Sequence, residues 1–201
     1  MNFESFREKI AYQPILLGIF ALLASGALAW ASSATGEAIA AAEAKDLRDS
    51  LSEVLPQGLA DNDFLTDTVD LKKGEKTITI YRARQGGVVK AALFKVAERG
   101  YAGDILVLMA VDTDGKTLGV RVIKHVETPG LGDKIEIKKD KWIKDFDGKS
   151  LGDPAPEKWS VKKDNGVFDQ FAGATITPRA VVKAVKGGLE FFTAHKTEIT
   201  G

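Results

Sequence analysis

Asp104-Ile105-Leu106-Val107-Leu108-Met109-Ala110-Val111 is an apolar run, bounded by Gly103, that decides the fold of this chain. It leads into Asp112-Thr113-Asp114-Gly115-Lys116, whose Asp and Gly residues strongly favour a tight turn. A second apolar run, Leu118-Gly119-Val120-Arg121-Val122-Ile123, follows that turn directly. Two β-prone runs joined by a short turn predict a β-hairpin from Ile105 to Ile123.

The segments outside the hairpin extend this prediction to a whole domain. Thr77–Tyr81 alternates and is β-branched, and Val88–Val96 is a second candidate strand after a Gly86-Gly87 turn. Near the carboxyl end, Pro178–Phe192 has the spacing of an amphipathic helix. Its apolar positions are Val181, Val185, Leu189 and Phe192. The expected fold class is therefore α+β, with an antiparallel sheet and flanking helices.

The amino-terminal region contains no charged residue from Ile10 to Gly36. A bilayer core of roughly 30 Å needs about 20 mostly apolar residues as a helix, so this stretch is long enough to cross it. Small residues in Ala27-Leu28-Ala29 and Ala29-Trp30-Ala31 leave a cleaved signal peptide as the alternative. The length of the run favours an anchor, and Arg7 and Lys9 before it favour a cytoplasmic start.

Three parts of the chain follow from these patterns. Residues 1–36 are expected to form a cytoplasmic stub and a transmembrane anchor, and residues 61–201 an extracytoplasmic domain. Residues 37–60 between them are rich in alanine and other helix formers up to Pro56-Gln57-Gly58, which predicts a helical connector. A polar linker without regular structure is the alternative for that segment.

Composition excludes several classes of function. The 201 residues include 28 basic and 28 acidic side chains, so the basic excess typical of nucleic-acid-binding proteins is absent. The chain has no cysteine, which excludes disulfides, thiolate metal sites and cysteine nucleophiles. His125 and His195 are the only imidazoles, so we expect no metal site.

The first segment that could carry chemistry is His125–Asp133, directly after the hairpin. Pro129 fixes one backbone angle, while Gly130 and Gly132 permit conformations closed to other residues. Such a loop can bring backbone N–H groups close to a planar ligand or an oxyanion. Taken alone, turn statistics favour an ordinary tight turn.

The second segment is Asp169–Val182. Thr177 followed by Pro178 is typical of a helix start, with Thr177 as the capping residue and Pro178 in the first helical position. Helix starts favour phosphate, and Arg179 would be a neighbour of a phosphate held there. Local patterns alone favour a simple capped helix over a ligand site.

The residues just before this helix are small. Gly173 and Ala174 would let a bulky group lie against the backbone, and Thr175 would present its hydroxyl beside that group.

Considered together, these motifs resemble the RnfG (RsxG) family of bacterial Rnf electron-transport complexes. They are also similar, more distantly, to the C subunit of the sodium-translocating NADH:quinone reductase. The resemblance covers nearly the whole chain and rests on the single span, Gly100–Gly103, Glu127–Gly132 and Asp169–Thr177. The family motif ends in Gly173-Ala174-Thr175, and Ala172 replaces its more usual hydroxyl residue.

The resemblance implies a flavoprotein in which FMN is covalently bound to Thr175 through a phosphoester, making the chain a phosphoprotein. Thr128 and Leu131 would contact the flavin ring. Implied cofactor-binding residues are Glu127, Thr128, Gly130, Leu131, Gly132, Gly173, Ala174 and Thr177. No catalytic residue and no metal ligand are implied.

The resemblance also implies a function. The chain would relay electrons within a translocase that couples electron transfer of the ferredoxin or NADH type to ion translocation, with no turnover of its own. It would cross the bacterial inner membrane once, with the FMN domain in the periplasm. Its partners would be the other proteins of the complex, a flavin transferase and membrane lipid. Because the span lacks charged residues, any ion path would lie in those partners.

Two alternatives from other classes stay open. A stand-alone exported flavin reductase would need an acid or base beside the ring, and only His125 and Glu127 lie near the loop. A structural adaptor without flavin is the other, suggested by Ala172.

Overall fold

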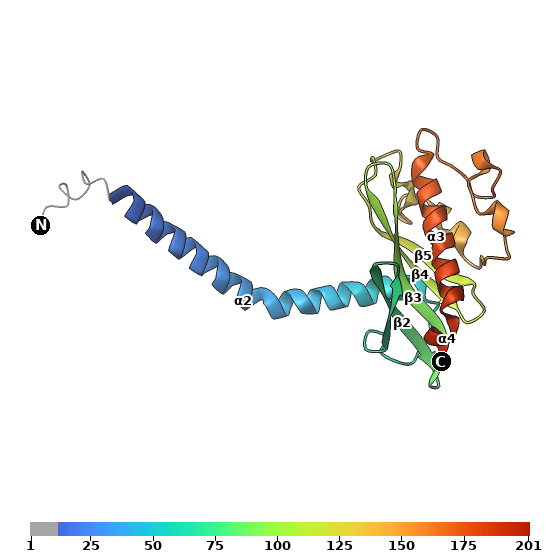
Figure 1. Cartoon of the computed structure of the whole chain (residues 1–201), viewed down its shortest axis with the longest axis horizontal. Helices are drawn as coiled ribbons and strands as arrows, with labels where there is room; N and C mark the ends of the chain where they lie inside the picture. The colour runs from blue at the N-terminus through green and yellow to red at the C-terminus, as the bar shows by residue number, and fades with distance from the viewer. Residues whose placement is uncertain (1–11) are drawn as a thin grey trace, which may run out of the picture. The chain divides into compact units, whose positions relative to one another are not determined.

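The computed structural model describes residues 12–201, so the predicted cytoplasmic stub with Arg7 and Lys9 lies outside the described residues. The chain divides between Leu47 and Arg48 into two compact units. Helix α2, Tyr12–Val54, supplies the described part of the first unit and enters the second (Figure 1). It contains an 18-residue window of mean hydropathy 2.0, none of which is buried, and is long and apolar enough to cross a membrane.

The second unit is built on a five-stranded sheet. Its strands follow one another in chain order, each antiparallel to the next, as a simple meander. The strands are β1 Thr68–Lys73, β2 Lys76–Gln85, β3 Val88–Arg99, β4 Asp104–Asp112 and β5 Thr117–Lys124.

The predicted hairpin is confirmed as β4 and β5. Asp112 closes its turn, because one carboxylate oxygen accepts hydrogen bonds from the backbone N–H groups of Asp114 (2.8 Å) and Lys116 (2.9 Å). Gly115 adopts a φ of +82°, which side chains disfavour. The predicted strands at Thr77–Tyr81 and Val88–Val96 are parts of β2 and β3, while β1 was not predicted.

Helix α3, Ile176–Ala194, packs along one face of the sheet, and the short helix α4, Lys196–Thr200, follows it (Figure 1). The four apolar positions that predicted an amphipathic helix are all buried. Gly188 allows the close packing, since a Cβ there would lie 2.3 Å from the sulfur of Met109 on β4. These elements confirm the α+β class.

On the other face of the sheet, the last residues of α2 pack against β5. Leu51 and Val54 are both buried, and the helix ends two residues before Pro56. Gly119 on β5 makes room for them, because a Cβ there would lie 2.6 Å from the carbonyl oxygen of Val54.

The long connection from β5 to α3 has little regular structure beyond four short 3-10 helices. These are η1 Asp133–Ile135, η2 Lys141–Phe146, η3 Pro156–Lys158 and η4 Lys162–Asp164. An aromatic cluster holds the connection together through ring contacts. Its members are Trp142, Phe146, Trp159, Phe168 and Phe171.

This aromatic cluster also fixes the segment that leads into α3. The rings of Trp142 and Phe171 lie 5.1 Å apart, and the indole N–H of Trp142 donates a 2.9 Å hydrogen bond to the carbonyl of Asp169. The backbone N–H of Ala174 in turn donates to the carbonyl of Phe171 at 3.1 Å. The position of Gly173–Thr175 therefore depends on side chains some 30 residues earlier in the chain.

Candidate functional site

A cavity of about 590 Å³ lies where the N-terminal end of α3 meets the loops after β3 and β5. Its volume falls within the range of small-molecule and cofactor sites. Four separate segments of the chain line it. The lining residues are Tyr101, Glu127, Thr128, Leu131, Gly132, Lys163, Gly173, Ala174, Thr175, Ile176 and Thr177. Eight of the nine residues predicted from the sequence to form the site are therefore brought together.

Glu127 joins three of these segments. Its side chain is buried, with 4% of the residue exposed. One carboxylate oxygen accepts a 3.0 Å hydrogen bond from the backbone N–H of Ala102, and the other accepts a hydrogen bond from the hydroxyl of Thr177, 50 residues away. Gly132 completes this packing, because a Cβ there would lie 2.9 Å from both the Cβ of Glu127 and the hydroxyl of Thr177.

The hydrogen bonds keep Glu127 ionised. Burial by itself raises the pKa of the Glu127 carboxyl. The hydroxyl of Thr177 and the backbone N–H groups of Ala102, Tyr101 and Gly103 outweigh burial, so the pKa lies below its ordinary value. Glu127 is thus a buried anion whose oxygens are already hydrogen-bonded, and it stabilises the wall of the cavity.

The prediction that Thr177 caps α3 is wrong. The helix begins at Ile176, Thr175 occupies the capping position, and no side chain caps the helix. Thr177 lies in the first turn and donates its hydroxyl to Glu127, because a buried carboxylate is a stronger acceptor than the backbone alternatives. The start of α3 therefore faces the cavity without a side-chain acceptor for its first N–H groups, an arrangement that favours an anion.

Arg179 is likewise not placed as predicted. Its guanidinium forms a two-point ion pair with the carboxylate of Asp164, with a distance of 2.6 Å between Nη2 and Oδ1. This pairing lowers the pKa of Asp164 and engages Arg179. Lys163, the neighbour of Asp164 on η4, is the cation that lines the cavity.

Thr175 lies on the cavity wall and is half-buried, between the exposed Gly173 and the buried Thr177. Gly173 has a φ of +78°, a conformation that other residues rarely adopt. A Cβ on Gly173 would lie 3.5 Å from a methyl group of Leu131, so the two predicted segments come into contact at the cavity.

The loop opposite Thr175 is a tight turn. The backbone N–H groups of Leu131 and Gly132 donate to the carbonyl of Thr128, at 3.2 Å and 3.0 Å. Gly130, with a φ of +80°, does not line the cavity. Its N–H donates to the buried carboxylate of Asp133 at 2.8 Å. Gly130 therefore shapes the loop, while the exposed Thr128 and Leu131 are available for contact.

His125 lies outside the cavity and is engaged on both ring nitrogens. Its Nδ1 accepts a hydrogen bond from the backbone N–H of Glu127 at 3.1 Å, and its Nε2 lies 3.0 Å from a carboxylate oxygen of Glu136. An accepting Nδ1 fits the tautomer in which Nε2 carries the proton. Neither His125 nor Glu127 is thus a free acid or base at the cavity. Within residues 12–201, no group of three or more acidic or histidine side chains could hold a metal ion.

Sequence reasoning did not select three of the lining residues. Tyr101 is 68% exposed and was visible in the Gly100–Gly103 motif, where an exposed aromatic ring is a signal for binding. Ile176 is 47% exposed at the first turn of α3. Lys163 had no local signal, because it reaches the cavity only through the fold of the aromatic-rich connection.

Comparisons with known proteins place these features in a family. Residues 100–190 match the model of the FMN-binding domain. The G subunit of the ion-translocating oxidoreductase complex of Cereibacter sphaeroides is 52% identical over 186 residues, covering 92% of this chain and 85% of that protein. The protein of the same name from Stutzerimonas stutzeri is 46% identical, and the match covers 96% of this chain and 86% of that protein. The one from Pseudomonas aeruginosa is 44% identical, and the match covers 96% of this chain and 93% of that protein. The crystal structure of Shewanella oneidensis NqrC aligns with a TM-score of 0.49 and 26% identity, over 71% of this chain and 72% of that one.

Proposed function

Because this chain belongs to the family formed by the G subunits of ion-translocating oxidoreductase complexes, we propose that it is the FMN-carrying member of such a complex. It takes part in electron transfer coupled to ion translocation as one part of a translocase, without turnover of its own. The observation that carries the proposal is the cavity of about 590 Å³, which joins Thr175 to the Thr128–Gly132 loop within the segment that matches the FMN-binding domain.

The lining of the cavity fits the two ends of FMN. At the phosphate end lie the uncapped start of α3 and Thr175, and Lys163 lines the same cavity. A helix start and a nearby cation both stabilise a bound phosphate. At the ring end lie the exposed side chains of Tyr101 and Leu131, which offer apolar surface to a planar group.

We propose further that FMN is covalently bound, with the hydroxyl oxygen of Thr175 joined to the phosphorus of the flavin. A flavin transferase is the partner that this modification requires. FMN supplies the redox chemistry when bound. The chain's own residues hold it: Thr175 tethers it, the exposed Thr128 and Leu131 lie against the ring, and Glu127 keeps the loops in place.

The membrane anchor belongs to the same proposal. The apolar part of α2 crosses the bacterial inner membrane once and contacts its lipid, with the amino terminus in the cytoplasm and the second unit in the periplasm. Support comes from the uncharged stretch within α2 and from Arg7 and Lys9 before it. The other proteins of the complex are its partners in electron transfer.

The alternative of an exported flavin reductase has less support. Such an enzyme needs an acid or base at the ring, yet His125 is outside the cavity and the oxygens of Glu127 accept hydrogen bonds from the protein. The structural adaptor without flavin does not account for a cavity of this size and lining.

Mass spectrometry of the chain from its native host tests the covalent proposal. After acid denaturation and digestion, the peptide that contains Thr175 should carry the mass of FMN joined with loss of water. Thr175→Ala should abolish the modification and electron transfer while the complex still assembles, and Thr177→Ala should retain Thr175 as the acceptor. An unmodified Thr175 peptide from the native host would refute the covalent attachment, and undiminished electron transfer by Thr175→Ala would favour the adaptor.

A further inference from the structure

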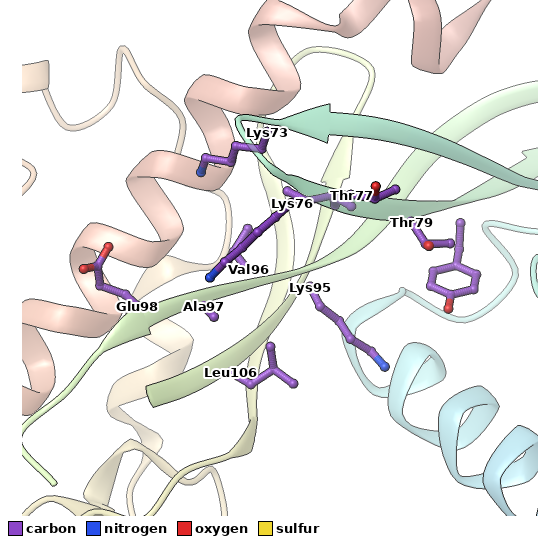
Figure 2. Close-up of a pocket in the computed structure, with 11 residues that line it drawn as sticks. Lys73, Lys76, Thr77, Thr79, Lys95, Val96, Ala97, Glu98 and Leu106 are labelled. Carbon is purple, nitrogen blue, oxygen red and sulfur yellow. The ribbon is translucent and has the colours of Figure 1, made fainter. Parts of the chain in front are cut away.

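A second cavity, of about 570 Å³, lies between β2 and β3, away from Thr175. Four consecutive residues of each strand line it, Lys76–Thr79 on β2 and Lys95–Glu98 on β3 (Figure 2). Three other residues complete the lining: Lys73, Tyr81 and Leu106.

This lining shows that the cavity is a break in the sheet. Successive side chains of a strand point to opposite faces, so a hollow on one face would be lined by every second residue only. Pairing between β2 and β3 stops at Ile80 and Phe94. Beyond that point β2 stays paired with β1 as far as Lys76, and β3 stays paired with β4 as far as Arg99. The two ribbons thus separate and leave an inner edge on each.

The backbone groups that face this break follow from the pairing pattern. Antiparallel strands alternate between residues that bond to one neighbour and residues that bond to the other. The backbone N–H of Gly100 donates to the carbonyl of Gly103. By the alternation, the even-numbered residues of β3 therefore direct their backbone N–H and C=O groups to β4. Lys95 and Ala97 therefore direct their N–H and C=O groups into the break. Leu93 lies opposite Tyr81, so by the same alternation Thr79 and Thr77 on β2 face the break.

A contact with α3 lies at the tip of the β1–β2 hairpin, beside the break. The ammonium of Lys73, at the tip of the β1–β2 hairpin, donates a 3.2 Å hydrogen bond to the carbonyl of Gly187 and lies 5.9 Å from the ring centre of Phe191. Figure 2 shows Lys73 directed toward the helix and not toward β3. The tip is thereby attached to α3.

The charge around the break is positive. Glu98 is paired with Lys183 at 2.9 Å. Among residues 12–201, the ion pairs include neither Lys76 nor Lys95. An occupant of the break therefore needs backbone donors and acceptors on both sides and negative charge near the two lysines.

We propose that an extended acidic segment of another protein of the complex inserts into this break as an additional β-strand. It would run antiparallel to one of the two strands and parallel to the other, and an acidic side chain would pair with Lys76 or Lys95. Strand addition of this kind obtains its affinity from main-chain hydrogen bonds and its specificity from the side chains. The outer edge of β1 offers only one side for pairing, whereas the break offers two. The inference rests on the proposed membership of a complex, and is independent of the flavin.

Hydrogen exchange measured on the full chain, alone in detergent and in the purified complex, tests the pairing directly. In the chain alone, the amides of Thr77, Thr79, Lys95 and Ala97 should exchange rapidly. In the complex their exchange should slow by about tenfold or more, as expected for amides in a formed ladder. Fast exchange in both samples would overturn the proposal, as would slow exchange in the chain alone. Flavin content of the same complex shows separately whether the proposed function holds.

Two pairs of variants identify the occupant. Ala97→Pro removes the N–H that faces the break without removing a bond to β4, and Ala97→Thr keeps that N–H as the control. Lys76→Glu reverses the charge at the break, and Lys72→Glu reverses one on β1 outside the cavity.

Ala97→Pro and Lys76→Glu should each lower the amount of chain retained in the complex by about tenfold, with melting temperatures of the free chain close to those of their controls. Equal retention of test and control variants overturns the proposal. So does a concentration-dependent dimer of the free chain that protects the same amides, because a second copy would then be the occupant.

Discussion

Replacement of Glu127 by glutamine should destabilise the domain by about 2 kcal/mol at neutral pH. The carboxylate accepts hydrogen bonds on both oxygens, from Ala102 and from Thr177, whereas a glutamine amide has only one oxygen. With that oxygen on the N–H of Ala102, the NH₂ group can donate to the hydroxyl of Thr177, so this hydrogen bond persists with its direction reversed and loses about 1 kcal/mol because its acceptor is no longer charged. The remaining bond to a neutral oxygen is weaker by about 1 kcal/mol.

The pH dependence of this difference provides a second check. The pKa of Glu127 is lowered in the folded state from an ordinary value of 4.5, so its stabilising contribution is complete above pH 4.5. The contribution is lost as the pH falls through the lower folded-state pKa. The free-energy difference between wild type and Glu127→Gln should therefore be constant near neutrality and decrease in acid. Asp67 and Asp133 also have lowered pKa values, but both proteins contain them, so their effects cancel.

Urea unfolding of the full chain in detergent, followed by tryptophan fluorescence, measures these quantities. Glu157→Gln is the matched control, because Glu157 is exposed on η3 and the same change there should stay within about 0.5 kcal/mol. A double-mutant cycle with Thr177→Val should give a coupling energy of about 1 kcal/mol or more. A loss below about 0.5 kcal/mol for Glu127→Gln, or a difference that does not change in acid, would refute the assignment of Glu127 as a buried anionic link.

Three further predictions concern packing and the cavity. Trp142→Ala should cost about 3–5 kcal/mol in urea unfolding, because it removes a buried indole from the aromatic cluster, and a loss under about 1 kcal/mol would contradict that role. Gly188→Ala should destabilise the domain by about 1–3 kcal/mol, because the new Cβ would lie 2.3 Å from the sulfur of Met109. The neighbouring change Gly187→Ala is the control. It should stabilise α3 by up to about 1 kcal/mol, because its Cβ meets only the Lys73 ammonium, at 3.6 Å. Equal melting temperatures for these two variants would argue against the close packing of α3. Leu131→Ala should change flavin fluorescence while the unfolding free energy stays within about 0.5 kcal/mol, because Leu131 is 44% exposed, and an unchanged flavin spectrum would remove it from the ring contacts.

Local patterns predicted the elements whose signals lie within a few residues. The β4–β5 hairpin followed from its Asp-rich turn, and α3 from the spacing of its buried positions. Strand β1 was missed because its alternation is short: Val69 and Leu71 are its only apolar residues, both are only half-buried, and two lysines follow them.

The cavity was predictable only in part. Its two loops were identified from their motifs. The contacts that join them span up to 50 residues and correspond to no pattern within either segment of the sequence. The role of Thr177 was misread because α3 begins at Ile176, before the Thr-Pro pair, and nothing in the sequence shows that the hydroxyl of Thr177 would donate to Glu127. Arg179 was assigned to a phosphate because nothing in the sequence shows that Asp164 would face it.

The hydrogen bond between Glu127 and Thr177 also has a consequence for the order of folding. Contacts between residues close in sequence form early, whereas contacts across 50 residues incur a larger loop-closure cost and form later. The β-hairpins should thus precede the cavity, which needs β5, the aromatic-rich connection and α3 together. An enzyme that recognises the assembled cavity around Thr175 would modify only chains that had finished folding. A chain that carries the cofactor would then be one that had already folded, before it joined the complex.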